Sequence, residues 1–330
     1  MSERSYDVCG IGNAIVDVLA SAKETFLSEQ GLTKGAMSLI DGARAEALYQ
    51  MMGPAREISG GSAANSMVGI QALGGSAAFI GKVRNDQLGG IFAHDIRAAG
   101  VDFPTLPAQD GPPTARCLIV VTPDGQRTMN TYLGACVGLG PAEVDAATVQ
   151  AAKVTYLEGY LFDPPEAKQA FLKAAELAHD AGRKVALTLS DPFCVERHRD
   201  DFRNLIEGHV DLLFANEAEA MSLAETDDLG SALSALEGKM DLAVVTRSAK
   251  GAILLSADGR EEVEAFPVQR VVDTTGAGDL FAAGFLAGYT KGKALKDCGR
   301  SGALAASEII SHFGARPEID LADFARQHLS

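Results

Sequence analysis

The side chains most suited to chemistry lie in one run near the C-terminus, Asp273-Thr274-Thr275-Gly276-Ala277-Gly278-Asp279. An apolar segment rich in glycine and alanine follows and predicts a helix that begins inside this run. The free backbone N–H groups of Gly276, Ala277 and Gly278 at such a helix start would form an anion hole, which the helix dipole strengthens. Asp279 at its mouth would repel a phosphate, but it suits a base that accepts a proton from an attacking hydroxyl. The run therefore predicts phosphoryl transfer with Asp279 as the catalytic base.

A purely structural interpretation of this run also exists. Asp279 could complete the dipole of the helix, and the glycines could simply close a turn. For a lone Gly-x-Gly that interpretation would be preferred, but aspartates on both sides of Thr-Thr-Gly-Ala-Gly favour the chemical one.

Two further motifs could hold a hydroxylated ligand. In Gly60-Gly61-Ser62-Ala63-Ala64-Asn65, the glycines permit close approach to the backbone and Asn65 supplies both a donor and an acceptor. In Gly12-Asn13-Ala14-Ile15-Val16-Asp17, the acid lies in an apolar run, and a buried carboxylate needs partners such as sugar hydroxyls. The structural alternatives are a glycine turn for the first motif and a turn-capping acid for the second.

A third motif, Asn216-Glu217-Ala218-Glu219, follows an apolar segment. Asn at a helix N-cap with Glu three residues later is a capping box, so the structural interpretation is strong here.

The elements that must position these residues alternate between short apolar strands and amphipathic helices, which indicates a parallel sheet covered on both faces. Ligands of such sheets bind beyond the carboxyl ends of the strands. The predicted strands are Tyr6–Gly12, Ala77–Gly81, Val154–Glu158, Lys184–Leu189, Leu212–Ala215, Leu242–Thr246 and Ala252–Ser256, and Pro165–Ala181 is a predicted helix.

Two segments interrupt this alternation. Residues 18–40 and 112–135 are predicted to be extended with turns, and the second contains a hairpin pattern around Pro123-Asp124-Gly125. We expect a single α/β domain over residues 1–330, with these inserted segments forming a small β-sheet lid over the site.

Composition narrows the class of protein. The 330 residues carry a formal charge of −15, which argues against nucleic acid or an anionic membrane as a partner. The five cysteines are dispersed without a Cys-x-x-Cys, so we expect free thiols in a reducing compartment. No apolar signal core or stretch of 18 apolar residues occurs, and we expect a cytoplasmic protein.

Taken together, the motifs resemble the signatures of the ribokinase-like (PfkB) carbohydrate and nucleoside kinases. The run ending in Asp279 is similar to their C-terminal signature, and Gly60–Asn65 with residues 73–89 is similar to their N-terminal one. The resemblance covers essentially the whole chain. It implies a three-layer α/β/α fold with a mainly parallel sheet and a β lid, ATP and Mg²⁺ as cofactors, a small-molecule acceptor, and a monomer or homodimer.

The resemblance also implies roles for individual residues. The acceptor would be held by Asn13, Asp17, Gly60, Gly61, Ser62 and Asn65, and the nucleotide by Asn216, Glu219, Thr246, Gly251, Thr275 and Gly314. Glu219 would order Mg²⁺ through water. Arg127, on the lid, would reach the transferred phosphate on closure, and Asp273 with Thr275 would lie where some members bind a monovalent cation such as K⁺.

The identity of the acceptor is a separate question. Several stretches, including Gly12–Asp17 and Leu189–Phe193, look closer to the adenosine kinases than to the ribokinases. However, Tyr160-Leu161 stands where adenosine kinases often carry two aromatics that border the purine, which leaves Tyr160, Phe162 and Phe193 as candidate base-stacking residues. We predict transfer of the ATP γ-phosphate to the 5′-hydroxyl of a ribonucleoside, with adenosine as the first hypothesis.

Other functions stay open at this point. A sugar kinase of the same family and a non-catalytic nucleoside- or sugar-binding protein are the alternatives. A nicotinamide oxidoreductase is disfavoured, because Ile15 stands where the third glycine of Gly-x-Gly-x-x-Gly is required, and no P-loop occurs.

Overall fold

The larger of two sheets forms the centre of the molecule in a computed structural model that describes residues 5–329. Its eight strands follow the order β13-β12-β11-β10-β9-β8-β1-β5. The strands from β5 to β11 run parallel, and β12 and β13 add antiparallel at one edge. The strands are β1 (Tyr6–Ile11), β5 (Ala77–Ile80), β8 (Ala152–Glu158), β9 (Lys184–Thr188), β10 (Leu212–Asn216), β11 (Leu242–Thr246), β12 (Ala252–Ser256) and β13 (Gly259–Val263). Each predicted strand is present, with ends within two residues of those expected.

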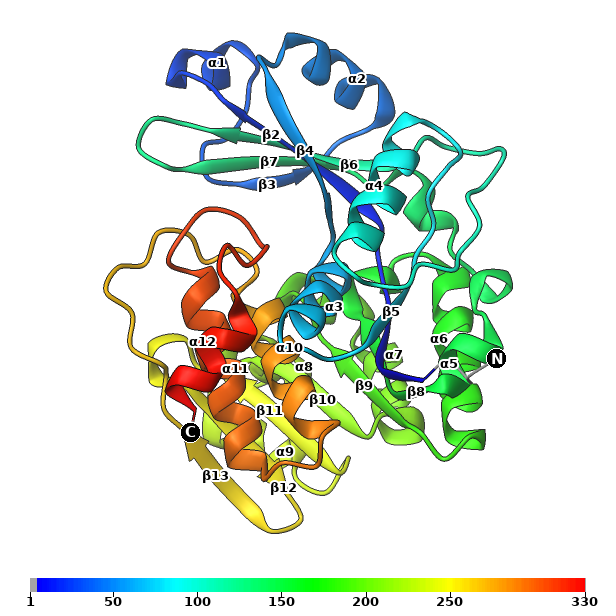
Figure 1. Cartoon of the computed structure of the whole chain (residues 1–330), viewed down its shortest axis with the longest axis vertical. Helices are drawn as coiled ribbons and strands as arrows, with labels where there is room; N and C mark the ends of the chain where they lie inside the picture. Colours follow the sequence, from blue (N-terminus) through cyan, green and yellow to red (C-terminus); the bar gives the residue numbers. More distant parts are fainter. Residues whose placement is uncertain (1–4, 330) are drawn as a thin grey trace.

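Helices cover both faces of this sheet, which confirms the three-layer arrangement (Figure 1). One face carries α3 (Ser62–Ala72), α10 (Ala277–Tyr289) and α11 (Leu295–Ile309). The other carries α5 (Ala146–Ala151), α6 (Pro165–Asp180), α7 (Pro192–His209), α8 (Glu217–Ala224) and α9 (Leu229–Leu236). Further helices are α1 (Glu24–Glu29), α2 (Gly42–Met51), α4 (Gln87–Ala98) and α12 (Leu321–His328).

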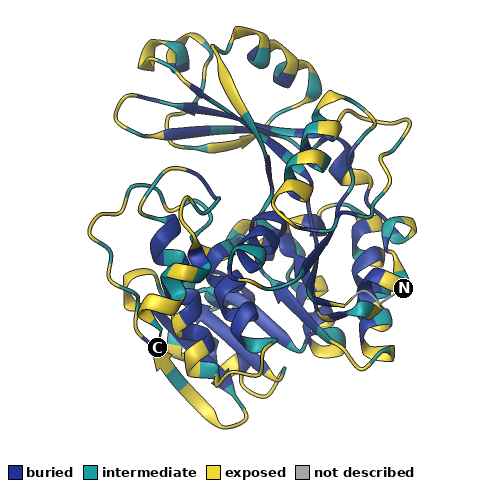
Figure 2. Ribbon diagram, viewed as in Figure 1, coloured by how far each residue is buried: buried dark blue, intermediate teal, exposed yellow. Residues whose placement is uncertain are grey.

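The period-2 pattern of the strands produces two separate apolar cores. In β10, Leu212 and Phe214 enter the core under α3, α10 and α11, whereas Leu213 and Ala215 enter the core under α5–α9. Burial on both faces explains why these strands are continuously apolar in sequence. Figure 2 shows the central strands as the most buried part of the molecule. All five cysteines are buried and unpaired, as expected.

A second sheet of five strands, in the order β3-β7-β6-β2-β4, stands apart from the first at the top of Figure 1. Its strands are β2 (Ile15–Ser21), β3 (Met37–Leu39), β4 (Ala55–Gly60), β6 (Ala115–Val121) and β7 (Arg127–Tyr132). The expected hairpin corresponds to β6 and β7, which pair antiparallel.

Two details of this region differ from the sequence-based expectation. Residues 18–40 are not wholly extended, because α1 forms at Glu24–Glu29 with Leu27 buried on its inner side. The small sheet also includes β4, which lies outside both predicted segments. Its sequence, Ala-Arg-Glu-Ile-Ser-Gly, begins with two exposed residues and lacks an apolar alternation that could have revealed it.

The carboxyl ends of β1, β8, β10 and β11 meet at one edge of the large sheet, facing the small sheet. Asn13, Glu158, Asn216 and Thr246 lie at or just beyond these ends. No helix within residues 5–329 is long and apolar enough to cross a membrane.

Candidate active site

Asp279 lies in the first turn of α10 and is held by two donors from the start of α3. Ser62 Oγ donates to one carboxylate oxygen at 2.6 Å and Asn65 Nδ2 donates to the other at 3.1 Å. Burial raises the pKa of Asp279 above its usual value, while these two hydrogen bonds and the positive charge of Arg316 oppose the rise. The result is a carboxylate with fixed orientation and increased basicity, as a general base requires.

Asp17 is a second acid in the same region, and it has no hydrogen-bond donor among the described residues. A Cβ on Gly60 would lie 2.4 Å from Asp17 Oδ2, so the glycine leaves the space that the carboxylate occupies. Burial raises the pKa of Asp17 to about 6, although Arg316 and Arg127 act against the shift. A half-buried carboxylate that no protein group donates to depends on water or on a ligand for its hydrogen bonds.

Glu158, at the end of β8, was not singled out from the sequence. Its carboxylate accepts from Asn13 Nδ2 at 2.7 Å and from the backbone N–H of Ala63 at 2.8 Å. Burial raises the pKa of Glu158 to about 7. The only signal in the sequence was an acid ending an apolar strand. Glu158 fixes Asn13 to the start of α3, so the Asn13 amide nitrogen is engaged within the protein.

The turn between β4 and α3 depends on Gly61. Its φ is 101°, in a region that favours glycine, and a Cβ there would lie 2.1 Å from the carbonyl oxygen of Asn13. Because of this close approach, the turn from Gly60 to Ser62 is packed against the loop that follows β1. The two predicted acceptor motifs, more than forty residues apart in sequence, therefore meet in space.

The start of α10 has the open backbone expected of an anion hole. Gly276 is the N-cap with φ 78°, and its α-carbon packs against Ala315. Gly278 is exposed, and no protein atom lies within 4 Å of the place where a Cβ would be. Protein packing therefore gives no reason for a glycine at position 278, whereas a ligand close to the backbone would.

Arg127 and Asp273 form an ion pair that joins β7 of the small sheet to the loop before α10. The distance from Arg127 Nη1 to Asp273 Oδ2 is 2.5 Å, and both side chains are buried. Asp273 Oδ2 also accepts from the N–H of Gly314 at 3.1 Å, and Oδ1 accepts from the N–H and hydroxyl of Thr275 at 3.0 and 2.7 Å. These contacts lower the pKa of Asp273, although burial opposes them. Every oxygen of Asp273 is thus occupied by a protein donor.

Asn216 and Glu219 form the capping box of α8. Glu219 accepts from Asn216 Nδ2 at 2.6 Å and from the Asn216 N–H at 3.0 Å, and its own N–H donates to Asn216 Oδ1 at 2.9 Å. Glu219 is 5 % exposed, and burial raises its pKa to about 7. The capping geometry is therefore present, and it leaves a desolvated carboxylate without a cationic partner among the described residues.

Two other residues predicted for the nucleotide side lie near the ends of β10 and β11. Thr246 is the neighbour of Asn216 in the parallel register. Gly251 has φ 81°, and a Cβ there would lie 1.9 Å from the carbonyl oxygen of Val263. Backbone packing alone thus explains this glycine.

The three candidate aromatics differ in their environment. Tyr160 is 38 % exposed, and burial together with the charges of Asp191 and Asp279 raises its pKa. Phe193 is 69 % exposed. Phe162 is only 2 % exposed, and its ring stacks on Phe202 at 4.0 Å between centroids, so its ring is part of the core and faces away from solvent.

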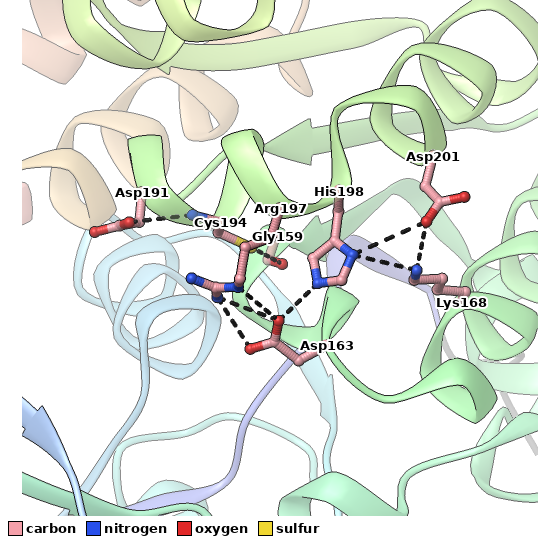
Figure 3. Close-up of polar contacts among 8 residues, drawn as sticks. All are labelled: Gly159, Asp163, Lys168, Asp191, Cys194, Arg197, His198 and Asp201. Carbon is pink, nitrogen blue, oxygen red and sulfur yellow. Dashed lines mark hydrogen bonds and ion pairs between the residues drawn. The ribbon is translucent and has the colours of Figure 1, made fainter.

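Polar contacts hold the segment around Tyr160 against α7, as Figure 3 shows. Cys194 Sγ donates to the carbonyl oxygen of Gly159 at 3.2 Å. Asp163 binds Arg197 at 3.1 Å and His198 at 2.6 Å. Because both flanks of Tyr160 are tied to the same helix, its ring sits on a fixed segment.

Residues 53–321 match the pfkB family carbohydrate kinase profile. The chain belongs to the pfkB family of carbohydrate kinases. Among solved structures, this pfkB kinase is 54 % identical to the adenosine kinase from Sinorhizobium meliloti, over 98 % of this chain and 99 % of the other, with a TM-score of 0.90. It is 53 % identical to a probable sugar kinase protein from Rhizobium etli CFN 42, over 98 % of each chain, with a TM-score of 0.91. Adenosine kinase 1 of Arabidopsis thaliana is 27 % identical over 95 % of this chain and 97 % of that protein.

The structure of this pfkB kinase gathers the predicted residues into three groups. Asp279 is hydrogen-bonded to the motif that starts α3, and Arg127 forms an ion pair with Asp273. Asn216 lies beside Thr246 on the neighbouring strand. Ser62 and Asn65 were predicted to touch substrate, yet in the structure their side chains bind Asp279. Glu158 is the residue near Asp279 that sequence reasoning missed. Arg316 belongs to the turn at Gly314 that was expected on the nucleotide side, and its side chain contacts the acceptor motif.

Proposed function

We propose that this pfkB kinase transfers the γ-phosphoryl group of ATP to the 5′-hydroxyl of a ribonucleoside, with adenosine as the preferred acceptor. The observation that carries the proposal is the carboxylate of Asp17 beside Gly60, which no described protein group donates to and which feels the charge of the oriented base Asp279. A vicinal diol would donate two hydrogen bonds to Asp17, and a primary hydroxyl on the same sugar would extend toward Asp279. The identity of 54 % with an adenosine kinase supports adenosine over other nucleosides.

In the proposed reaction, Asp279 accepts the proton of the 5′-hydroxyl while the hydroxyl oxygen forms a bond to the γ-phosphorus. The bond between that phosphorus and the β,γ-bridging oxygen breaks, and ADP leaves with the electron pair. The N–H groups of Gly276, Ala277 and Gly278 would stabilise the charge on the transferred group. Thr246, Gly251 and Gly314 would line the nucleotide side.

Magnesium fits this site as a largely hydrated ion. No group of three or more His, Cys, Asp or Glu side chains among the described residues could hold a metal. Magnesium commonly binds one or two carboxylates and completes its shell with water and phosphate oxygens. Glu219, a buried carboxylate without a cationic partner, would hold one of those waters, with Asn216 fixing its orientation. When bound, the ion would neutralise phosphate charge.

The small sheet would act as the lid. Arg127 contacts Asp273 rather than open solvent, so the hairpin already reaches the loop before α10. Phosphate oxygens of ATP would compete with Asp273 for this guanidinium, which forms paired hydrogen bonds with either partner. Arg127 would thus approach the transferred group when ATP is bound.

A monovalent cation does not fit Asp273, because its carboxylate oxygens are occupied by Arg127, Gly314 and Thr275. We therefore expect kcat to be unchanged when K⁺ in the assay is replaced by tetramethylammonium at equal ionic strength. Initial rates at saturating ATP and acceptor would test this. Strict K⁺ dependence would mean that the Arg127–Asp273 pair opens and yields its position to an ion.

A sugar is the second candidate acceptor. Leu161 has no ring and Phe162 lies in the core, so of the three candidate aromatics Tyr160 and Phe193 are the two that are exposed. The identity of 53 % with the probable sugar kinase protein from Rhizobium etli also supports a sugar as the alternative acceptor.

A panel of acceptors with ATP would test the proposal. We expect adenosine to give the highest kcat/KM, with guanosine and cytidine lower and with ribose and fructose near background. The 2′-deoxy and 3′-deoxy forms of adenosine should both bind worse than adenosine, because each removes one hydroxyl from Asp17. Turnover of a free sugar with every ribonucleoside inert would refute the nucleoside assignment.

Acceptor binding should weaken at acidic pH. Asp17 has a pKa of about 6 without ligand, and hydroxyl donors stabilise its charged form. The affinity should therefore be constant above pH 6 and fall by about tenfold for each pH unit below it, because protonation then competes with binding. Isothermal titration of adenosine into the enzyme without ATP would measure this dependence.

The Asp17→Asn variant provides the control for that titration. It is needed because the pKa values of Glu158 and Glu219, about 7, lie close to that of Asp17. It should bind adenosine weakly at every pH. If its affinity still fell below neutrality, the dependence would belong to Glu158 or Glu219 rather than to Asp17.

A further inference from the structure

Arg316, in the turn between α11 and α12, makes four hydrogen bonds with the region around the acceptor motif. Nε and Nη2 donate to the carbonyl oxygen of Ser59 at 3.2 and 2.6 Å, and Nη2 also donates to Ser59 Oγ at 3.0 Å. Nη1 donates to the carbonyl oxygen of Ala64 at 3.2 Å. One guanidinium group thus binds both sides of the turn that contains Gly60, Gly61 and Ser62.

This contact connects distant parts of the chain. Ser59 lies near the end of β4, and Ala64 lies in the first turn of α3. Asp95 of α4 supports the same point, because its Oδ2 accepts from the N–H of Ser59 at 2.8 Å and from its hydroxyl at 2.6 Å. Two residues before Arg316, the N–H of Gly314 binds Asp273. The C-terminal turn therefore contacts both the acceptor motif and the loop that precedes α10.

The charge of Arg316 has no direct carboxylate partner within residues 5–329, since its hydrogen bonds go to carbonyl and hydroxyl oxygens. It acts through space on Asp17 of β2, Asp95 of α4 and Asp279 of α10. Its charge lowers the pKa of Asp279 and of Asp17, against burial, which raises both. Desolvation lowers the pKa of Arg316 itself to about 10, so the guanidinium remains charged at neutral pH.

Two acids and two tyrosines lie around Asp279, and its negative charge also acts on the tyrosines, Tyr156 and Tyr160. Asp17 of β2 and Glu158 of β8 are both desolvated, and each is subject to the negative charge of Asp279. Arg127 of β7 acts on Asp17. Arg316 is therefore the cation that favours the ionised form of the base before nucleotide binds.

We propose that Arg316 is a positioning residue of the reaction: it holds the turn from Ser59 to Ala64 so that Ser62 and Asn65 meet Asp279, and its charge supports the base. The inference rests on the proposed phosphoryl transfer but not on the identity of the acceptor. A lysine could keep the charge, but its single ammonium group could not reproduce the planar fork that binds Ser59 and Ala64 together.

The test compares Arg316→Gln, Arg316→Lys and a control, Arg56→Gln. The control removes an exposed arginine from β4, the strand that contains Ser59. In Arg316→Gln, kcat/KM should fall by about 100-fold, since misplacement of reacting groups by an ångström has an effect of that order. The acid limb of its pH–kcat profile should also move to higher pH, because the base loses the charge that favours ionisation. Arg316→Lys should keep the wild-type acid limb while its acceptor KM rises, and Arg56→Gln should match the wild type in both.

Thermal unfolding would show whether each variant is folded. If Arg316→Gln does not fold, Arg316→Lys provides the test by itself. A wild-type acceptor KM in Arg316→Lys would overturn the positioning role. A wild-type acid limb in Arg316→Gln would overturn the electrostatic role, and so would an acid limb moved to higher pH in Arg316→Lys, which keeps the charge. Wild-type enzyme that phosphorylates none of the panel of nucleosides and sugars would instead refute the proposed function, so the two failures are distinguishable.

Discussion

Replacing Asp279 with asparagine is expected to lower kcat by about 10²- to 10⁴-fold, the range for loss of a positioned general base. Acceptor binding should be retained. The asparagine has nearly the shape of the carboxylate, and its oxygen can still accept from Ser62 Oγ, the donor that lies 2.6 Å from Asp279. Initial rates and calorimetric titration of the acceptor would separate kcat from binding.

The folded state of this variant should be at least as stable as the wild type. Burial raises the pKa of Asp279, which means that the charged form is held against a desolvation cost. Asparagine removes that charge. A loss of activity accompanied by an unchanged or higher melting temperature would therefore exclude unfolding as its cause.

Asp297→Asn is the matched control. Asp297 occupies the same position in the first turn of α11 that Asp279 occupies in α10, and its side chain is exposed. Both substitutions remove an acid from a helix N-terminus, which alone costs about 0.3–1 kcal/mol of stability. In Asp279→Asn, the desolvation cost that is relieved offsets this loss. Only Asp279→Asn should lose turnover. Wild-type turnover in that variant would restore the structural interpretation of Asp279 as a dipole-completing acid.

Much of the architecture follows from local patterns. The continuously apolar runs identified the parallel strands, because those strands are buried on both faces. The small sheet was only partly predictable, because β4 carries two charged residues and no apolar alternation, and its pairing with β2 is set by tertiary contacts. The short helix α1 was missed for a similar reason, since its one buried residue, Leu27, gives no periodicity.

The site was predictable where a catalytic or ligand-binding acid stands in an unusual sequence context. An acid after a glycine-rich helix start and an acid inside an apolar run pointed to Asp279 and Asp17. The partners of these acids could not be deduced in the same way. Ser62 and Asp279 are 217 residues apart. Arg316 lies in the turn at Gly314 that the resemblance placed on the nucleotide side. Its contact with the acceptor motif could not be deduced, because an arginine near a C-terminal turn is ordinarily solvated.

The motifs predicted least well the pocket for the purine ring of the acceptor. Phe162 and Tyr160 are two residues apart, on one short segment, yet the first packs against Phe202 and the second is partly exposed. Side-chain direction in an irregular segment depends on the helix that packs against it. No periodicity rule could have separated the two rings.

The anion hole gives the second large effect, through Gly278→Ala. A methyl group there meets no protein atom within 4 Å, so the fold should accept it, and alanine in place of glycine in a helix should add about 0.5–1 kcal/mol of stability. If a phosphoryl group approaches this backbone, the methyl group would occupy part of its space. Loss of one stabilising donor of this type lowers kcat by about 10²- to 10³-fold, and we expect an effect of that size.

Gly90→Ala supplies the comparison, because Gly90 is likewise exposed, lies in the first turns of α4 and has no atom within 4 Å of a Cβ. Both variants should gain similar stability in thermal unfolding, since the change in backbone entropy is the same. Turnover at saturating ATP should fall in Gly278→Ala alone. Equal, wild-type rates in the two variants would show that the helix start serves only to begin α10, and the stabilising donors would then have to be sought elsewhere, with Arg127 the first cation to examine.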